Sequence, residues 1–110
     1  QVGELDYKFA DVTASHLPKG GVSADSTDGA IADLDRDGYL DLISSTWGSQ
    51  NRLLLNQGDA HFGDFTSSLP RDADYSRFVV ITDVDNDKVD DVIFGGRGMI
   101  RIYLNKTPKP

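Results

Sequence analysis

Cysteine is absent from the 110-residue chain, and long apolar runs and basic residues are scarce. Without cysteine, neither disulfide bonds nor thiol chemistry can operate, so a small domain needs a metal or other chains to reinforce its core. No apolar run approaches the roughly 18 residues that cross a bilayer, and the longest, around residues 78–82, is the length of a strand. The sequence therefore predicts no membrane insertion.

The charge balance excludes another class of partner. Eleven basic and eighteen acidic residues give a formal net charge of -7 with no basic stripe, which repels nucleic acid and anionic lipid and favours cations. A hydrophobic content of 38% with 26% charged residues predicts one folded, soluble domain over residues 1–110. Because the chain opens with Gln1 and shows no basic-then-apolar leader, we expect a processed mature form or an excised fragment.

An internal repeat is present. Residues 33–43 (DLDRDGYLDLI) match residues 83–93 (DVDNDKVDDVI) at an offset of 50 residues. The match continues in "RLLLN" ending at Asn56 and "RIYLN" ending at Asn105, and residues 7–18 match residues 60–70. Chance similarity does not preserve order across three blocks, so we interpret the chain as two tandem repeats, about 7–66 and 67–107.

Each repeat reads as short strands separated by turns, with no helical stripe longer than two turns. The predicted strands are residues 30–32, 42–43, 52–56 and 62–66 in the first repeat, and 78–82, 92–94 and 100–105 in the second. Four short strands about every fifty residues are typical of propeller blades. The predicted fold is all-β, with two four-stranded antiparallel propeller-type blades.

The blades are offset along the chain. Residues 27–66 make one complete blade, whereas the second ends at Asn105 without a fourth strand, and residues 7–13 are the homologue of that strand. Two blades cannot close a ring alone. Either the chain is a piece of a longer one, or the N-terminal strand completes a blade of another copy by β-strand addition, which gives a homo-oligomeric ring or a filament.

The repeated acidic loops predict two calcium sites. Calcium takes about six to eight oxygen ligands, and a tight turn supplies them by spacing carboxylates at alternate positions. The first predicted ligand set is Asp33, Asp35, Asp37, the main-chain carbonyl of Tyr39, and Asp41; the second is Asp83, Asp85, Asp87, the carbonyl of Val89, and Asp91.

Two other interpretations of these loops are weaker. An EF-hand needs flanking helices and a glutamate at the twelfth position, where this chain has Ser44 and Phe94. Solvated turn aspartates explain one such loop more readily than two copies of a nine-residue pattern.

These residues resemble the FG-GAP/VCBS-type β-propeller repeats, a family that includes integrin α-subunit head domains and bacterial and fungal secreted proteins. The resemblance runs from about Phe9 to Thr107 and includes Gly95-Gly96 and "NRLLLNQGDAHFGDFT". It implies a propeller of about six to eight blades with one calcium per motif-bearing blade. Lys88 departs from the glycine the family prefers, so we expect a weaker second site, partly compensated by Asp90.

Three further residues carry candidate roles. Trp47, with Tyr75, could stack on a sugar ring, although packing between blades explains the tryptophan more simply. Asn105-Lys106-Thr107 is a formal glycosylation sequon followed by Pro108. Nothing arranges a nucleophile, a base and an orienting group, so we predict no catalytic residue and no enzyme activity.

The sequence predicts a non-catalytic, calcium-stabilised extracellular repeat module with a structural or adhesive role, assembled head to tail by strand exchange. Two alternatives stay open: a glycan-binding propeller lectin, and blades of a larger secreted enzyme or receptor. A glycan or a cell-surface protein is the predicted external partner.

Overall fold

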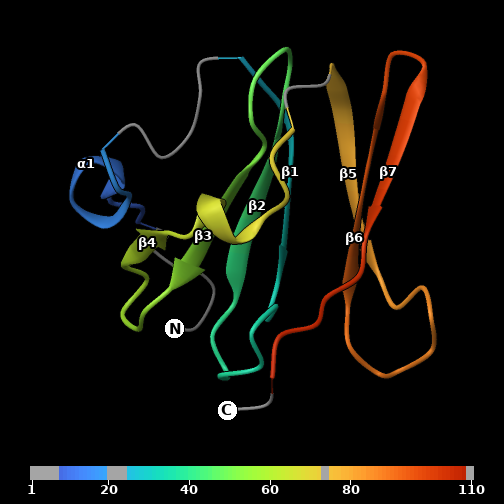
Figure 1. Cartoon of the computed structure of the whole chain (residues 1–110). Coiled ribbons are helices and arrows are strands. Elements are labelled where there is room, and N and C mark those ends of the chain that lie inside the picture. Colours follow the sequence, from blue (N-terminus) through green and yellow to red (C-terminus); the bar gives the residue numbers. More distant parts are fainter. Residues whose placement is uncertain (1–7, 20–24, 73–74, 109–110) are drawn as a thin grey trace, which may run out of the picture.

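The computed structural model describes residues 8–19, 25–72 and 75–108, which form two antiparallel sheets (Figure 1). The first sheet has the order β1-β2-β3-β4, with strands Ser26–Ala32, Asp41–Thr46, Arg52–Asn56 and Phe62–Asp64. The second has the order β5-β6-β7, with strands Ser76–Thr82, Asp91–Gly96 and Met99–Tyr103. Two one-turn helices complete the described elements: α1 at Thr13–His16 and the 3-10 helix η1 at Thr66–Ser68. The all-β prediction is confirmed.

The two sheets repeat each other in register as well as in sequence. In both, the first strand pairs with the second across an acidic loop, and both pairings shift by one residue near their far end, at Ser26/Asp28 and Ser76/Phe78. A bulge at the same repeat position twists each sheet in the same way. Corresponding side chains of the two sheets therefore point to corresponding faces.

The core lies between the sheets. Ile43 and Leu53 of the first sheet pack with Val79, Val92 and Phe94 of the second. Ile43 and Phe94 have no exposed surface, and burying a side chain of this size contributes about 1.5–3 kcal/mol. The apolar face of each strand thus holds the two sheets together.

The N-terminal strand prediction needs correction. Tyr7 lies outside the described residues, residues 8–12 form no strand, and Thr13–His16 is helical. A strand needs an adjacent edge with which to pair, and residues 8–12 pair with none of the described strands. The Phe9 side chain is accordingly 95% exposed. The three-stranded second sheet agrees with the prediction that its fourth strand is missing from the C-terminal part of the chain.

Both acidic loops lie at the same end of the molecule, and the segment after β7 runs beside the first of them (Figure 1). The Asn105 side-chain amide donates a hydrogen bond to the Leu34 carbonyl at 2.7 Å, and Arg36 donates one to the Thr107 carbonyl at 2.6 Å. The end of the second repeat is thereby tied to the loop of the first.

No helix in the described ranges is long and apolar enough to span a bilayer.

Candidate metal centre

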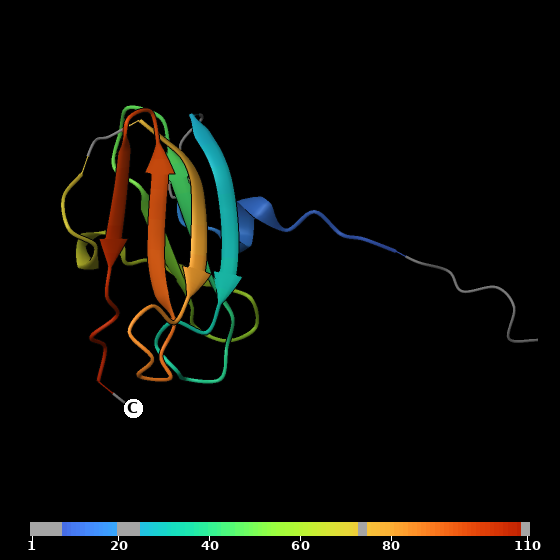
Figure 2. The ribbon, with the colours of Figure 1, turned by 90° about the vertical axis from the view of Figure 1, so that its right-hand side faces the viewer.

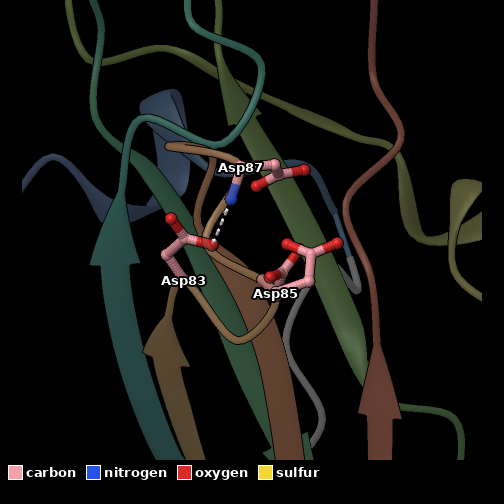
Figure 3. Close-up of side chains that lie close together, drawn as sticks. Asp83, Asp85 and Asp87 are labelled. Atoms are coloured by element: carbon pink, nitrogen blue, oxygen red, sulfur yellow. Dashed lines mark hydrogen bonds between the residues drawn. The ribbon is translucent and has the colours of Figure 1, made fainter.

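The first aspartate of each loop closes the turn by accepting two main-chain hydrogen bonds. Asp33 accepts from the amides of Asp37 at 3.1 Å and Gly38 at 2.8 Å. Asp83 accepts from the amide of Asp87 at 3.1 Å (Figure 3) and from that of Lys88 at 2.7 Å. These bonds bend the backbone around the carboxylate, so the sequence at each loop fixes its own local geometry.

The turn passes twice through the left-handed region. In the first loop these residues are Arg36 at φ 60° and Gly38 at φ 94°, and in the second Asn86 at φ 61° and Lys88 at φ 70°. Lys88, where the resemblance implies a glycine, therefore has a positive φ. A side chain larger than that of asparagine is strained there by about 1 kcal/mol.

The carboxylates converge in both loops. Oxygen atoms of Asp33, Asp35 and Asp37 lie within 4.8 Å of one another. In the second loop the same holds for Asp83, Asp85, Asp87 and Asp91. Figure 3 shows the first three of these side chains. These oxygens form the donor set that calcium prefers.

The convergence raises the pKa of the central carboxyl of each loop. Burial, followed by the charges of Asp41 and Asp37, raises the pKa of Asp35 to about 6. Burial, a hydrogen bond with Asp87 and the charges of Asp87 and Asp91 raise the pKa of Asp85, while Lys106 opposes the rise. The protein alone therefore stabilises these negative charges poorly.

One oxygen in the first loop has no partner in the protein. Asp35 Oδ1 is buried and forms no hydrogen bond. Leaving such an atom unpaired is unfavourable, and a cation among three carboxylates satisfies it directly. The residues present therefore fit a hard divalent cation such as calcium.

The last aspartate of each loop has a second task that the sequence pattern does not show. Asp41 has no exposed surface, and its two oxygens accept hydrogen bonds from the amides of Leu34 at 2.8 Å and Asn56 at 2.9 Å. Asp41 thus joins the loop to the end of β3.

Asp91 joins the second loop to the segment after β7 in the same way, with the amides of Val84 at 2.9 Å and Asn105 at 2.7 Å. Those amide bonds, aided by Lys106, lower the pKa of Asp91. In Asp41 burial outweighs the corresponding bonds, so its pKa is raised. The protein therefore stabilises the ionised form of Asp41 less well than that of Asp91.

The remaining predicted ligands stay predictions. The amides of Tyr39 and Val89 each donate to the preceding aspartate, Asp37 and Asp87, at 3.0 Å. This bond orients the peptide next to the predicted carbonyl ligand.

Comparison with protein-family models gave a match over residues 33–94 to the FG-GAP-like repeat, a segment that contains both acidic loops. The chain belongs to this FG-GAP-like repeat family. It is therefore a repeat module of propeller type, which agrees with the paired sheets. Searches of curated proteins and of solved structures found no match.

The flanks of the FG-GAP-like loops exclude an EF-hand. Strands precede and follow both loops, and the residues at the twelfth position, Ser44 and Phe94, lie buried within β2 and β6. Neither can reach an ion held by its loop.

Trp47 lies at the opposite end of the sheets from the loops, and it packs between the repeats. It forms an isolated bridge with Tyr75, the two rings are 4.7 Å apart, and the Arg77 guanidinium sits 4.9 Å from the indole centre. Packing between blades accounts for these contacts. Glycan binding by Trp47 and Tyr75 stays a prediction.

The Asn105 side chain already has two partners. Its amide nitrogen bonds Leu34 and its oxygen accepts from the Thr107 amide at 3.0 Å. A glycan at Asn105 attaches to the nitrogen that ties the two repeats together and leaves it one hydrogen to donate, and glycosylation stays a prediction.

The sequence analysis missed a buried polar cluster between the repeats. Asn51 has no exposed surface; its oxygen accepts from the Thr46 amide at 2.8 Å, and its nitrogen donates to Asp72 and Ser76. The Tyr103 hydroxyl donates to the same Asp72 carboxylate at 2.8 Å. Isolated polar residues in turn segments carry no periodic signal, so only the fold reveals this cluster.

Replacing Lys88 with glycine is expected to stabilise the protein by about 1 kcal/mol, because glycine adopts positive φ without strain. Calcium affinity at the second site should also rise, since a positive charge beside the loop is lost. Chemical unfolding with and without calcium measures both effects. The matched control is Gly38→Ala: a Cβ there meets nothing within 4 Å, so only the backbone strain at φ 94° remains and the protein should lose stability. Equal stability of Lys88→Gly and the wild type would contradict this account.

Proposed function

We propose that this chain is a non-catalytic, calcium-stabilised repeat module. The observation that carries the proposal is the buried, unpartnered Asp35 Oδ1 among converging carboxylates. When bound, calcium neutralises the loop carboxylates and links the two strands that flank each loop. It supplies the reinforcement that disulfides cannot give in a chain without cysteine.

The proposed setting is extracellular, with a structural or adhesive role. Sites built on exposed hairpin loops have modest affinity, on the order of 10⁻⁴–10⁻³ M in extracellular modules, which suits the calcium concentration outside cells. FG-GAP-like repeats are typically non-enzymatic structural modules. Eight of the aspartates belong to the two predicted ligand sets, where calcium ligation accounts for them.

Calcium titration of the chain, followed by calorimetry, tests the proposal. We expect two ions per chain, one lost in Asp35→Asn and the other lost in Asp85→Asn. The matched control is Asp59→Asn, which removes one exposed carboxylate outside the loops and should bind two ions. No saturable binding at millimolar calcium, or equal losses in all three variants, would overturn the proposal.

A further inference from the structure

Among the described strands, the second sheet ends in an unpaired edge, whereas the corresponding edge of the first sheet is paired. β7 pairs with β6 alone in the described part of the chain, whereas its counterpart β3 pairs with both β2 and β4. In Figure 2, β7 forms the outer border of the second sheet. The first repeat therefore shows how a fourth strand pairs with the edge that is unpaired in the second.

In the first repeat, β4 and the turn that follows it are attached to β3 by hydrogen bonds. The amide of Phe65 donates to the Leu53 carbonyl at 2.9 Å, and the Leu53 amide donates to the Thr66 hydroxyl at 3.0 Å. Asp64 accepts from the Thr66 amide at 3.0 Å and pairs with Arg52 of β3. Together these bonds attach the fourth strand to the third.

Residues 9–18 already have the local structure of that fourth strand's end. Asp11 accepts from the Thr13 amide at 3.0 Å, as Asp64 does from Thr66. Val12 has φ -110° and ψ 15°, close to the φ -115° and ψ 24° of Phe65. The segment thus has the local structure to pair with an edge that it does not meet among the described strands of its own chain.

The segment cannot serve its own β7 from where it lies. The ring of His16 in α1 stacks on that of His61 at 3.9 Å, which holds α1 beside β4. Figure 1 shows α1 and β7 at opposite sides of the molecule.

The outer face of the second sheet is apolar in the same way as the buried face of the first. In the first sheet the row Ala30, Ile43 and Leu53 packs into the core. The corresponding row in the second sheet is Val80, Ile93 and Ile102. Its members Val80 and Ile102 are 44% and 54% exposed.

This face is wider than one row. Phe78 and Ile100, which flank Gly95 on the same side, are 41% and 69% exposed. Figure 2 looks onto the face, and none of the coloured elements crosses in front of it.

The complementary face is on the first sheet. Ile81, Val92 and Tyr103 are the second-sheet row that packs on the first sheet, and their counterparts are Ile31, Leu42 and Leu54. Ile31 is 64% exposed. Leu42 is half-buried and Leu54 is 1% exposed, so the first sheet presents its side of this interface at its β1 end, through Ile31.

We propose that copies of this chain associate head to tail. Residues 9–18 of one copy pair with β7 of the next, and the first sheet of the incoming copy covers the face of Phe78, Val80, Ile93, Ile100 and Ile102. The surfaces are different on the two partners, so the contact is heterologous and repeats into a ring or a filament. This inference concerns assembly and goes beyond the calcium proposal, on which it does not depend.

Two exposed residues allow each half of the contact to be removed separately. Phe9→Asp disables the donor segment, and Ile102→Lys disables the acceptor face. Neither side chain packs substantially within its own chain, at 95% and 54% exposure. Ser67→Lys is the matched control, because Ser67 of η1 is exposed and belongs to neither set of contact residues nor to a calcium loop.

Light scattering of the eluting protein, in excess calcium and over a range of concentrations, measures the mass. The wild type and Ser67→Lys should exceed the 12.0 kDa of one chain, and each interface variant alone should run as a monomer. An equal mixture of Phe9→Asp and Ile102→Lys should give a dimer, because one partner keeps an intact segment and the other an intact edge. The dimer also shows that both variants are folded.

A monomeric wild type at all concentrations overturns the inference, as does an oligomer that survives both substitutions or a mixture that stays monomeric. Calcium titration of the two monomeric variants keeps the proposals separate. If the wild type binds two ions but does not assemble, only the assembly proposal is contradicted. If it assembles but binds no calcium, only the calcium proposal is contradicted.

Discussion

Chelation of calcium is expected to lower the melting temperature of this protein by on the order of 10–20 °C. At about 5 mM calcium, two sites with dissociation constants on the order of 10⁻⁴–10⁻³ M contribute about 2–5 kcal/mol by mass action. For a domain of this size, about 1 kcal/mol corresponds to roughly 4–8 °C. Differential scanning calorimetry of the wild type in calcium and in chelator measures the shift.

The difference in melting temperature between the protein in calcium and in chelator should decrease as the pH falls. The pKa of Asp35 is raised to about 6, so in chelator its contribution to stability is present below the ordinary aspartate pKa and is lost as the pH rises through 6. Calcium requires the ionised carboxylate, and its binding therefore weakens below pH 6. As the pH falls from 7.5 to 5, the calcium-bound protein should lose stability. Over the same range, protonation of Asp35 should make the calcium-free protein more stable.

Asp35→Asn separates the two effects. The substitution removes the repulsion, so in chelator the variant should melt above the wild type at pH 7.5, while its response to calcium falls by about half. Asp59→Asn should behave like the wild type in both conditions. A wild-type melting temperature that chelator leaves unchanged would contradict the calcium account.

The sequence predicted the loops and strands because their signals are local. Alternating aspartates around a turn define each loop, and β-branched runs mark β5 and β6. The strand predicted over residues 7–13 was wrong for the described part of that range because a strand also depends on a neighbour. Residues 9–18 have the same turn geometry as their counterparts at 62–70, because that geometry depends on local sequence. They lack the strand pairing, because pairing depends on a neighbouring strand.

The polar contacts between the repeats were not predictable for a related reason. Asn51 and Asp72 lie 21 residues apart, and their pairing depends on how the second sheet packs on the first. Spacing alone also assigned Asp41 and Asp91 a single role as ligands. Their complete burial, and the amides that both accept, give them a structural role that persists without a metal.

Asp41→Ala is therefore expected to destabilise the protein by about 3–5 kcal/mol even in chelator. It leaves the amides of Leu34 and Asn56 without their acceptor, at about 1–3 kcal/mol for each buried donor, and adds a cavity. Asp41→Asn keeps one acceptor oxygen and should lose about half as much. Urea unfolding in chelator measures both, with a comparison of slopes to check that the transition stays two-state.

Asp35→Ala is the control that distinguishes a structural role of Asp41 from a role in calcium ligation. Asp35 Oδ1 accepts no hydrogen bond, so its removal should abolish binding at the first site and leave the stability in chelator equal to or above that of the wild type. Asp91→Ala should repeat the Asp41 result in the second loop, because Val84 and Asn105 lose the same two bonds. If Asp41→Ala and Asp35→Ala were equally stable in chelator, Asp41 would act only as a ligand, and the join between each loop and its outer strand would have to come from other contacts.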